Sequence, residues 1–391
     1  MNLIEVSSPR LARQFLEMPL TIYQNDPNWI RPLDRDIEAV FDPSRNKRFQ
    51  YGSARRWLLV DNGHAIGRVA AFYDEKTATL TEYRAGGIGF FECINDQQAA
   101  NMLFDACRHW LASQGLEAMD GPINFGERDA WWGLLIEGFQ PPVYRMNYNP
   151  AYYQHLFEQY GFREYYNQLV FHYPVSKPIP DDFYQRGQRA MKLLGVTVKN
   201  LEQISLKELA RSIALIYNEA WAHMRHFKPL TQEQVLWQLQ TLKPVMDKKL
   251  IYVAYAGTRP IGFFLMMPDI NQIVKRLNGK FGLWEKLKFL WYLHRRSVNR
   301  IFGLLFGIVP DYQGKGVEAA MIIEAARIVQ RHLRHYHDME MNWIGDFNTR
   351  MIRMVSKLGT ELCRRYRTYR YLFDPSKPFS RYRFDDDGSN A

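Results

Sequence analysis

The sequence predicts an α/β protein of two domains in tandem, each with a mixed, mainly antiparallel twisted sheet flanked by helices. Three observations predict this class. The chain has 391 residues, which suits two to three domains of roughly 150 residues each. Hydrophobic residues make up 47% and charged residues 24%, as in ordinary folded proteins. The two halves also show the same expected order of strands and helices, so we expect domains at 1–178 and 179–378 and a polar tail at 379–391.

The first half is expected to run in the order strand, helix, hairpin, strand, helix, strand, helix, strand. The hairpin is predicted by two β-rich runs on either side of Asp61-Asn62-Gly63, a strong turn signal. We expect a strand at residues 3–6, a helix that ends at 15, the hairpin at 54–74, a strand at 88–93, a helix at 96–113 and a strand at 117–121. An aromatic loop at 123–139 and a helix from Asn149-Pro150 to Gly161 follow, before a strand rich in Tyr and Arg.

The second half repeats this order. The most specific repeat is the last helix, because Asn149 lies twelve residues before Gly161 and Asn348 lies eleven before Gly359. A glycine after a helix is a common C-cap, so the repeated order carries the argument. The elements of the second half are expected at residues 196–200, 205–222, 250–269 as a hairpin, 301–308, 317–333, 340–344 and 348–359.

Composition limits the classes of binding partner and the cellular compartment that we expect. Lys and Arg number 51 against 41 Asp and Glu, a net charge of +10, which favours phosphate groups, acidic lipids or acidic proteins as partners. Three cysteines without a CxxC pair predict a reducing compartment and no cysteine zinc site. The first residues have no apolar core of the kind found in signal peptides, so we expect no export signal there, and no apolar run reaches the roughly 20 residues of a membrane span. We expect a cytoplasmic protein without a metal ion, with any membrane contact at the inner surface.

One turn in the second half carries a signal for phosphate binding. An apolar strand runs into Gln313-Gly314-Lys315-Gly316 and directly into an amphipathic helix, and amides at such a helix start can hold a diphosphate. An ordinary strand-to-helix turn with two glycines is the alternative. The predicted cofactor-binding residues are Ile308, Val309, Gln313, Gly314, Lys315, Gly316, Val317 and Ala319.

This turn resembles the diphosphate loop of the Gcn5-related N-acetyltransferase (GNAT) superfamily, Q/R-x-x-G-x-G/A. Gln313 and Gly316 match, whereas the sixth position is Glu318, an acid expected to crowd or repel a phosphate. The corresponding segment of the first half, 90–104, has no glycine loop. The resemblance covers residues 2–178 and 190–375, and segments such as 121–139, 148–162 and 309–322 look like a little-characterised bacterial family of tandem GNAT proteins.

The resemblance implies an N-acyltransferase that moves an acyl group from acyl-CoA or acyl carrier protein to an amine. The tandem architecture is similar to that of N-myristoyltransferases, and bacterial ceramide synthases are GNAT-related, so a long acyl chain and a small-molecule or lipid amine are further expectations. These two comparisons are analogies of fold. The alternative is a GNAT-fold binding or scaffold protein without activity.

The resemblance also suggests catalytic residues. Glu340, on the fifth strand of the second half, is the candidate general base, with a plain strand acid as the alternative. Asn348 is expected either to cap its helix or to contact the cofactor. The family often has a Tyr acid about seven residues after this position, where this chain has Val355, so the acid stays unassigned.

A polar and aromatic loop in the first half is the candidate acceptor-binding region. We expect Asn124, Glu127 and Trp131 to contact the head group of a substrate carried by the second half, since binding residues concentrate on loops. The alternative is a packed loop between the domains.

A basic and aromatic insertion occupies residues 271–300. From Lys275 to Arg300 it holds eight Lys and Arg against one acid, Glu285. Leu283, Trp284, Leu287, Leu290 and Trp291 are expected on one helical face, the pattern of a helix lying in the plane of an anionic membrane. A helix packed on the second domain is the alternative. No nucleic-acid-binding module accompanies the insertion, so we expect no nucleic-acid partner.

Overall fold

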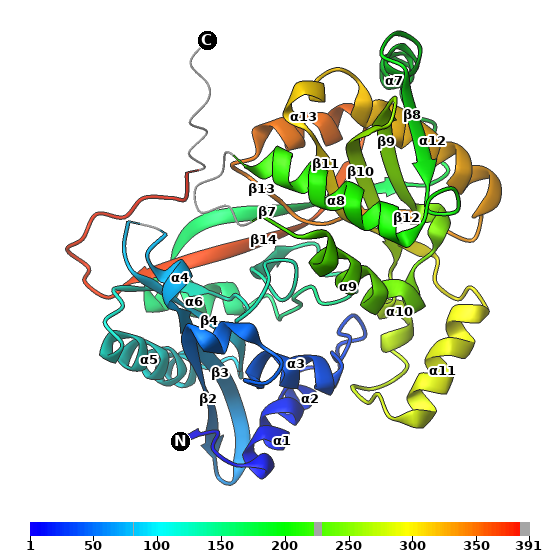
Figure 1. Cartoon of the computed structure of the whole chain (residues 1–391). Coiled ribbons are helices and arrows are strands. Elements are labelled where there is room, and N and C mark those ends of the chain that lie inside the picture. Colours follow the sequence, from blue (N-terminus) through cyan, green and yellow to red (C-terminus); the bar gives the residue numbers. More distant parts are fainter. Residues whose placement is uncertain (81, 223–228, 384–391) are drawn as a thin grey trace.

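The computed structural model describes residues 1–80, 82–222 and 229–383, and its strands form one mixed sheet with helices packed on it (Figure 1). Most neighbouring strands are antiparallel, and β4 with β5 and β11 with β12 are parallel pairs. This confirms the predicted α/β class with helices flanking a mainly antiparallel sheet. Residues 384–391 of the predicted tail lie outside the described residues.

The first half follows the predicted order closely. Asn62 (φ 47°) and Gly63 (φ 82°) form the predicted hairpin turn, and α5 ends before Gly115 (φ 75°). The last helix begins at Tyr153 rather than at Asn149-Pro150, because the Asn149 side chain is bound to the backbone of Leu135. The elements are β1 (Asn2–Glu5), α1 (Pro9–Glu17), α2 (Pro19–Ile22), α3 (Asp34–Phe41), η1 (Lys47–Gln50), β2 (Gly52–Asp61), β3 (His64–Asp74), α4 (Glu75–Ala78), β4 (Ala85–Cys93), α5 (Gln97–Ser113), β5 (Ala118–Gly121), β6 (Leu134–Glu137), α6 (Tyr153–Tyr160) and β7 (Arg163–Pro174).

The second half begins with an additional helix, α7. The strand predicted at 340–344 is wrong in detail, because Asn342 and Trp343 interrupt it and divide it into β12 and β13. The elements are α7 (Asp181–Leu193), β8 (Val196–Asn200), α8 (Leu206–Trp221), α9 (Gln232–Leu242), η2 (Lys243–Val245), η3 (Lys248–Leu250), β9 (Ile251–Ala256), β10 (Arg259–Pro268), α10 (Asn271–Val274), α11 (Leu283–His294), β11 (Arg300–Ile308), η4 (Pro310–Tyr312), α12 (Val317–His332), β12 (Asp338–Met341), β13 (Ile344–Gly345), α13 (Thr349–Lys357) and β14 (Glu361–Leu372).

The two halves exchange their last strands. The sheet order is β1-β2-β3-β4-β5-β14-β7-β12-β11-β10-β9-β8, so β14 pairs with β5 of the first half and β7 pairs with β12 of the second. The two exchanged strands also pair with each other at the centre of the sheet. The domain boundary at residue 178 stays a prediction. In the structure, the sheet of each half contains the last strand of the other half.

Each half of the sheet opens where its parallel pair of strands stops pairing. In the first half β4 and β5 pair over Ala85–Gly87, and in the second half β11 and β12 pair over Arg300–Gly303. The register of β4 and of β11 shifts against the neighbouring strand just beyond these residues. Helix α12 packs against α7, β8 and β9, and α8 packs against β10 and β11. These helices and strands bring the start of α12 to the open end of the second half.

Candidate functional site

A cleft of about 680 Å³ lies at the opening of the second half. Aromatic and aliphatic side chains from α8, β11 and the end of β13 meet basic side chains from α7 and α13 there. The lining residues are Arg186, Ala220, Trp221, Phe306, Gly307, Ile308, Gln313, Gly314, Glu318, Phe347, Asn348, Thr349, Arg350, Met351, Arg353, Met354 and Lys357. The cleft therefore combines an apolar surface with a cationic rim.

The turn before α12 leaves its backbone amides available. Gly316 is the N-cap of α12 with φ 85°, a left-handed conformation that glycine adopts at low cost, and no side chain caps this helix. Within the described ranges, no hydrogen bond of good geometry joins the amides of residues 314–319 to an acceptor, whereas the amide of Gln313 bonds to the carbonyl of Pro310 at 3.1 Å. A helix start with open N–H groups is a site for an anion.

Gln313 connects the two walls of the cleft. Its Nε2 donates to the carbonyl of Ile308 at 3.0 Å, and its Oε1 accepts from Nη1 of Arg350 on α13 at 2.7 Å. The side chain thus fixes the loop to the end of β11 and holds α13 beside it.

The predicted cofactor-binding residues have different positions. Ile308, Gln313 and Gly314 line the cleft, and Lys315 is exposed on the loop. Val309, Val317 and Ala319 are fully buried, so their side chains support the loop from the core. Four basic residues of the cleft were not among the predicted site residues, namely Arg186, Arg350, Arg353 and Lys357. The spacing of the last three on one helix was a usable signal, whereas nothing in the sequence marked Arg186.

Glu318 does not project as an isolated negative charge. It is 6% exposed in the first turn of α12, and its Oε1 accepts from Nη2 of Arg186 on α7. Its Oε2 has no hydrogen-bond partner among the residues that the structure describes. The ion pair with Arg186, a residue outside the loop, offsets this negative charge, and that the acid crowds or repels a phosphate stays a prediction.

The corresponding helix start in the first half is closed. Asp96 caps α5, and its side chain accepts from the amide of Ala99 at 2.8 Å. A carboxylate occupies the place where an anion would bind, which agrees with the missing glycine loop. The first half therefore has the fold without the phosphate site.

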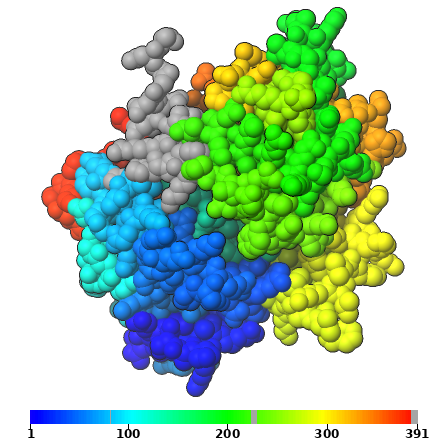
Figure 2. All heavy atoms as spheres, viewed as in Figure 1, coloured from blue at the N-terminus to red at the C-terminus, as the bar shows by residue number. Residues whose placement is uncertain are grey.

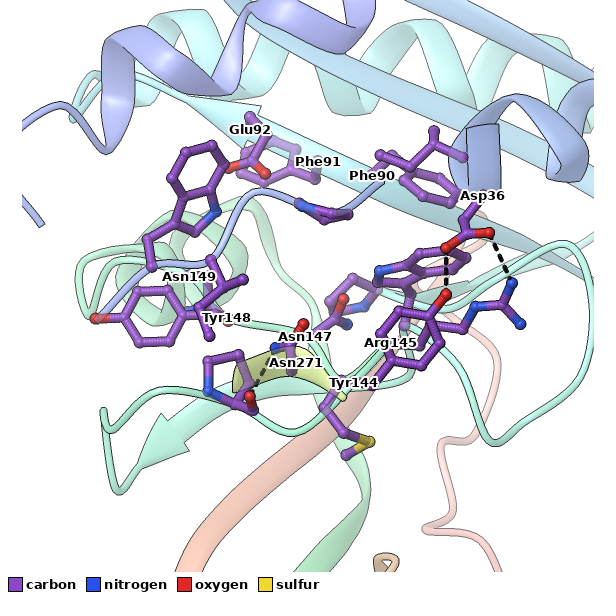
Figure 3. Close-up of a pocket in the computed structure, with 18 of the residues that line it drawn as sticks. Asp36, Phe90, Phe91, Glu92, Tyr144, Arg145, Asn147, Tyr148, Asn149 and Asn271 are labelled. Atoms are coloured by element: carbon purple, nitrogen blue, oxygen red, sulfur yellow. Dashed lines mark hydrogen bonds and ion pairs between the residues drawn. The ribbon is translucent and has the colours of Figure 1, made fainter. Parts of the chain in front are cut away.

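The opening of the first half instead holds a small, partly open cavity of about 70 Å³ (Figure 3). On one wall Asp36 accepts hydrogen bonds from Tyr144 and from Arg145. Asn271 reaches this cavity from the second half and donates to the carbonyl of Pro142 at 2.7 Å. The loop that carries Tyr144 and Arg145 thus closes the opening.

A second buried network borders the same cavity. Oε2 of Glu92 accepts from the hydroxyls of Tyr23 at 2.8 Å and Tyr153 at 2.9 Å, and its Oε1 lies 3.4 Å from Nη2 of Arg68. Burial raises the pKa of Glu92 above its usual range, against the opposing effect of Arg68. The network connects α2, β3, β4 and α6, and its hydrogen bonds offset part of the cost of burying these polar groups.

The structure does not bring the three predicted acceptor-binding residues together. Trp131 lines the partly open cavity, while Asn124 lines a different pocket of the first half. The Glu127 side chain is 81% exposed and lies 3.4 Å from Arg48. Their shared role stays a prediction.

Glu340 lies outside the cleft lining. It is 4% exposed and forms ion pairs with Arg300 at 2.9 Å and with Arg364. Its role as general base stays a prediction, and these contacts favour a structural role. Asn348 lines the cleft and caps α13, accepting from the amide of Met351 at 3.1 Å. Val355 is fully buried at the usual position of the acid.

The basic insertion carries an exposed apolar face. Phe289 is buried against the domain, but Leu283, Trp284, Leu287, Leu290 and Trp291 are between 49% and 74% exposed. We call these five residues the α11 apolar face. Helix α11 stands at the periphery of the molecule, in yellow in Figures 1 and 2. One side of α11 therefore packs on the protein and the other side is exposed, and membrane binding by this helix stays a prediction.

The described residues contain no helix long and apolar enough to cross a membrane. Within the same described ranges, no group of three or more His, Cys, Asp or Glu side chains is placed to hold a metal ion.

Comparison with solved structures decides the fold. The structure matches a tandem GNAT protein from the clavulanic acid biosynthesis pathway with a TM-score of 0.54 and 10% sequence identity, over 96% of this chain and 100% of that one. The chain has the tandem GNAT fold. No family model matches the sequence.

Two curated proteins are similar to this tandem GNAT chain over nearly its whole length. It is 26% identical over 375 residues to the protein named "Bacterial ceramide synthase" of Caulobacter vibrioides, over 94% of this chain and 97% of that protein. It is 28% identical over 371 residues to "Protein YghO" of Escherichia coli, over 91% of this chain and 92% of that one. The similarity therefore includes both halves.

Proposed function

We propose that the protein is an N-acyltransferase that binds acyl-CoA in the cleft of its second half and transfers the acyl group to an amine. One observation carries this proposal: the described structure gives the amides of residues 314–319 at the start of α12 no hydrogen-bond acceptor, and Gly314 and Glu318 of this segment line the cleft beside its cationic rim. A diphosphate placed there would receive several N–H groups and the favourable end of the helix dipole. The relative named a ceramide synthase supports acyl transfer to an amine.

The donor is proposed to be acyl-CoA rather than acyl carrier protein. A row of open amides suits the diphosphate of coenzyme A, whereas the arm of a carrier protein has a single phosphate. Arg350, Arg353 and Lys357 lie at i, i+3 and i+7 on α13 and line the same cleft, so they supply further positive charge for the nucleotide.

The free edge of β11 is the proposed place for the reacting thioester. In the described structure β12 pairs with β11 only up to Gly303, so Leu305 to Ile308 have no strand partner on that side. Backbone groups of an unpaired edge can bind an extended arm as an added strand and can polarise a carbonyl. The amine would then attack the carbonyl carbon, the C–S bond would break, and the amine proton would leave with a base or water.

The acceptor is proposed to be a lipid amine and the acyl chain to be long. Trp221, Phe306, Met351 and Met354 give the cleft an apolar surface that suits a hydrocarbon chain. The relative's name supports the same assignment.

The α11 apolar face is proposed to dock on an anionic membrane, which would place the protein at the inner membrane surface. Five exposed basic residues lie on α11 or next to it in the sequence and match the charge of acidic lipids, namely Lys280, Lys286, Lys288, Arg295 and Arg296. Exposed Trp and Leu side chains on a basic helix insert into the headgroup region. A lipid substrate would then reach the enzyme from the surface to which α11 binds.

A GNAT-fold binding protein without activity is the second candidate. The specific observation in its favour is that Glu318 is the only carboxylate among the described residues that line the cleft, and it is already paired with Arg186. The fold would then bind a thioester without a side chain that accepts the proton.

Calorimetry and turnover separate these candidates. We expect the full chain to bind CoA and decanoyl-CoA with micromolar affinity, and to release free thiol from acyl-CoA when a long-chain amine is added. Binding without turnover, across a series of amines presented on vesicles, would support the binding protein. Absence of binding by every acyl-CoA would overturn both assignments of the cleft.

A further inference from the structure

We propose that Arg186 is a ligand of the donor diphosphate and that Glu318 is the residue that positions it. This inference rests on the proposed function, since it assigns two roles within the same cleft. It also explains why this chain has an acid at the sixth position of a loop that otherwise suits an anion.

Helix α7 is fixed tightly against the start of α12. A Cβ added at Gly316 would lie 2.7 Å from the carbonyl oxygen of Arg186, and one added at Gly187 would lie 2.9 Å from the carbonyl carbon of Ala319. The two helices therefore approach through glycines, and side chains there would force them apart. This packing places residue 186 beside the open amides.

Arg186 has hydrogen-bond capacity left for an anion. Its side chain is 30% exposed and lines the cleft. One nitrogen, Nη2, donates to Glu318, while Nε and Nη1 have no acceptor among the residues that the structure describes. A guanidinium held by a carboxylate on one side can offer its other N–H groups to a phosphate oxygen.

Glu318 acts through Arg186. The carboxylate is buried, and one of its two oxygens already lacks a partner. Without Arg186 both oxygens would be unpaired and the negative charge would stand at the phosphate site, which costs binding energy in two ways. Without Glu318 the guanidinium would lose its fixed position, but no negative charge would remain. The two residues are therefore expected to be coupled, and the loss of Arg186 alone should be the most damaging change.

The test is a double-mutant cycle measured by calorimetry with decanoyl-CoA. We expect Arg186→Ala to weaken binding roughly 10- to 100-fold, as for a lost charge-assisted contact, and Glu318→Ala to weaken it by less than about tenfold. The double variant should bind at least about fivefold more tightly than Arg186→Ala alone. Arg186→Lys should bind more tightly than Arg186→Ala but less tightly than the wild type, since lysine keeps the positive charge but lacks the paired N–H groups of the guanidinium.

Decanoyl-pantetheine, which lacks the diphosphate, is the second probe. Its affinity, measured by competition, should change less than about twofold in all four variants, whereas a merely structural role would lower the affinities of both probes together. The inference is overturned if the wild type binds decanoyl-CoA but Arg186→Ala binds it equally well, or if the double variant is no tighter than Arg186→Ala. Failure of the wild type to bind any CoA ester would overturn the proposed function instead.

Discussion

The Arg350 guanidinium donates a hydrogen bond of 2.7 Å to Oε1 of Gln313, which joins α13 to the loop before α12 across the mouth of the cleft. Both residues line the cleft, and Gln313 is also fixed to the carbonyl of Ile308. The contact therefore supports the anion loop from α13 and adds a positive charge near it.

Replacing Arg350 by Ala should weaken the binding of CoA about 5- to 20-fold, because the loop loses one support and the cleft loses one charge. Arg331→Ala is the matched control, since Arg331 is an exposed arginine at the far end of α12. Calorimetry should show a change for Arg350→Ala alone, with the melting temperature of both variants nearly unchanged. Equal affinities in the two variants would exclude Arg350 from the binding site.

Glu340→Gln should lower the stability of the protein. The substitution leaves Arg300 and Arg364 without their shared carboxylate in a buried site, and the loss of one partner from such a cluster costs about 3 kcal/mol or more. Chemical denaturation should show this as a lower midpoint with an unchanged slope. If Glu340→Gln kept the stability of the wild type but lost turnover, this result would support Glu340 as the general base.

Asp269 should make stability depend on pH. Its burial raises its pKa from 3.8 to about 7, against the opposing effect of Arg300. Between these two values the folded protein holds a proton that the unfolded chain releases, so the contribution of Asp269 to stability falls as the pH rises from about 4 to 7.

Asp269→Asn should remove this dependence, because the amide oxygen can still accept from the backbone of Tyr144 and Asn271. We expect the stability of the variant relative to wild type to increase over this pH range, by an amount on the order of 3 kcal/mol in total. Denaturation midpoints at several pH values give the two curves. Parallel curves would mean that Asp269 is already ionised in the folded protein.

Changing Trp284 and Trp291 to Glu should lower binding to vesicles of phosphatidylglycerol by at least about tenfold, because the α11 apolar face would then carry two acids. Trp237→Glu is the matched control, since Trp237 is 68% exposed on α9, outside this face. Vesicle sedimentation should show loss for the first variant and no change for the control. Undiminished binding by the double variant would reject the membrane role of α11.

Local patterns predicted most of the fold and part of the site. The hairpin at Asn62-Gly63, the helix ended by Gly115 and the turn at Gly314-Gly316 depend on neighbouring residues, so the sequence shows them directly. The exchange of β7 and β14 depends on pairing between strands about 200 residues apart, and no local pattern of hydrophobicity records which strand pairs with which.

The residues around the cleft show the same difference between features set by neighbouring residues and features set by distant ones. Gln313 and Gly316 were found because one short segment contains them, whereas the partner of Glu318 is Arg186, on a helix 132 residues away in the sequence. Glu340 was predicted as the general base, with a plain strand acid as the alternative, and its partner Arg364 could not be foreseen because it lies on the exchanged strand β14. Charge pairs made by distant segments are set by tertiary contacts, so no local pattern in the sequence could show them.

A crystal structure of the full chain with decanoyl-CoA tests the central claim most directly. We expect diphosphate oxygens within about 3.2 Å of amides in the segment 314–319, at the start of α12, with the acyl arm along the free edge of β11. A donor bound elsewhere, or bound here with these amides left empty, would contradict the account.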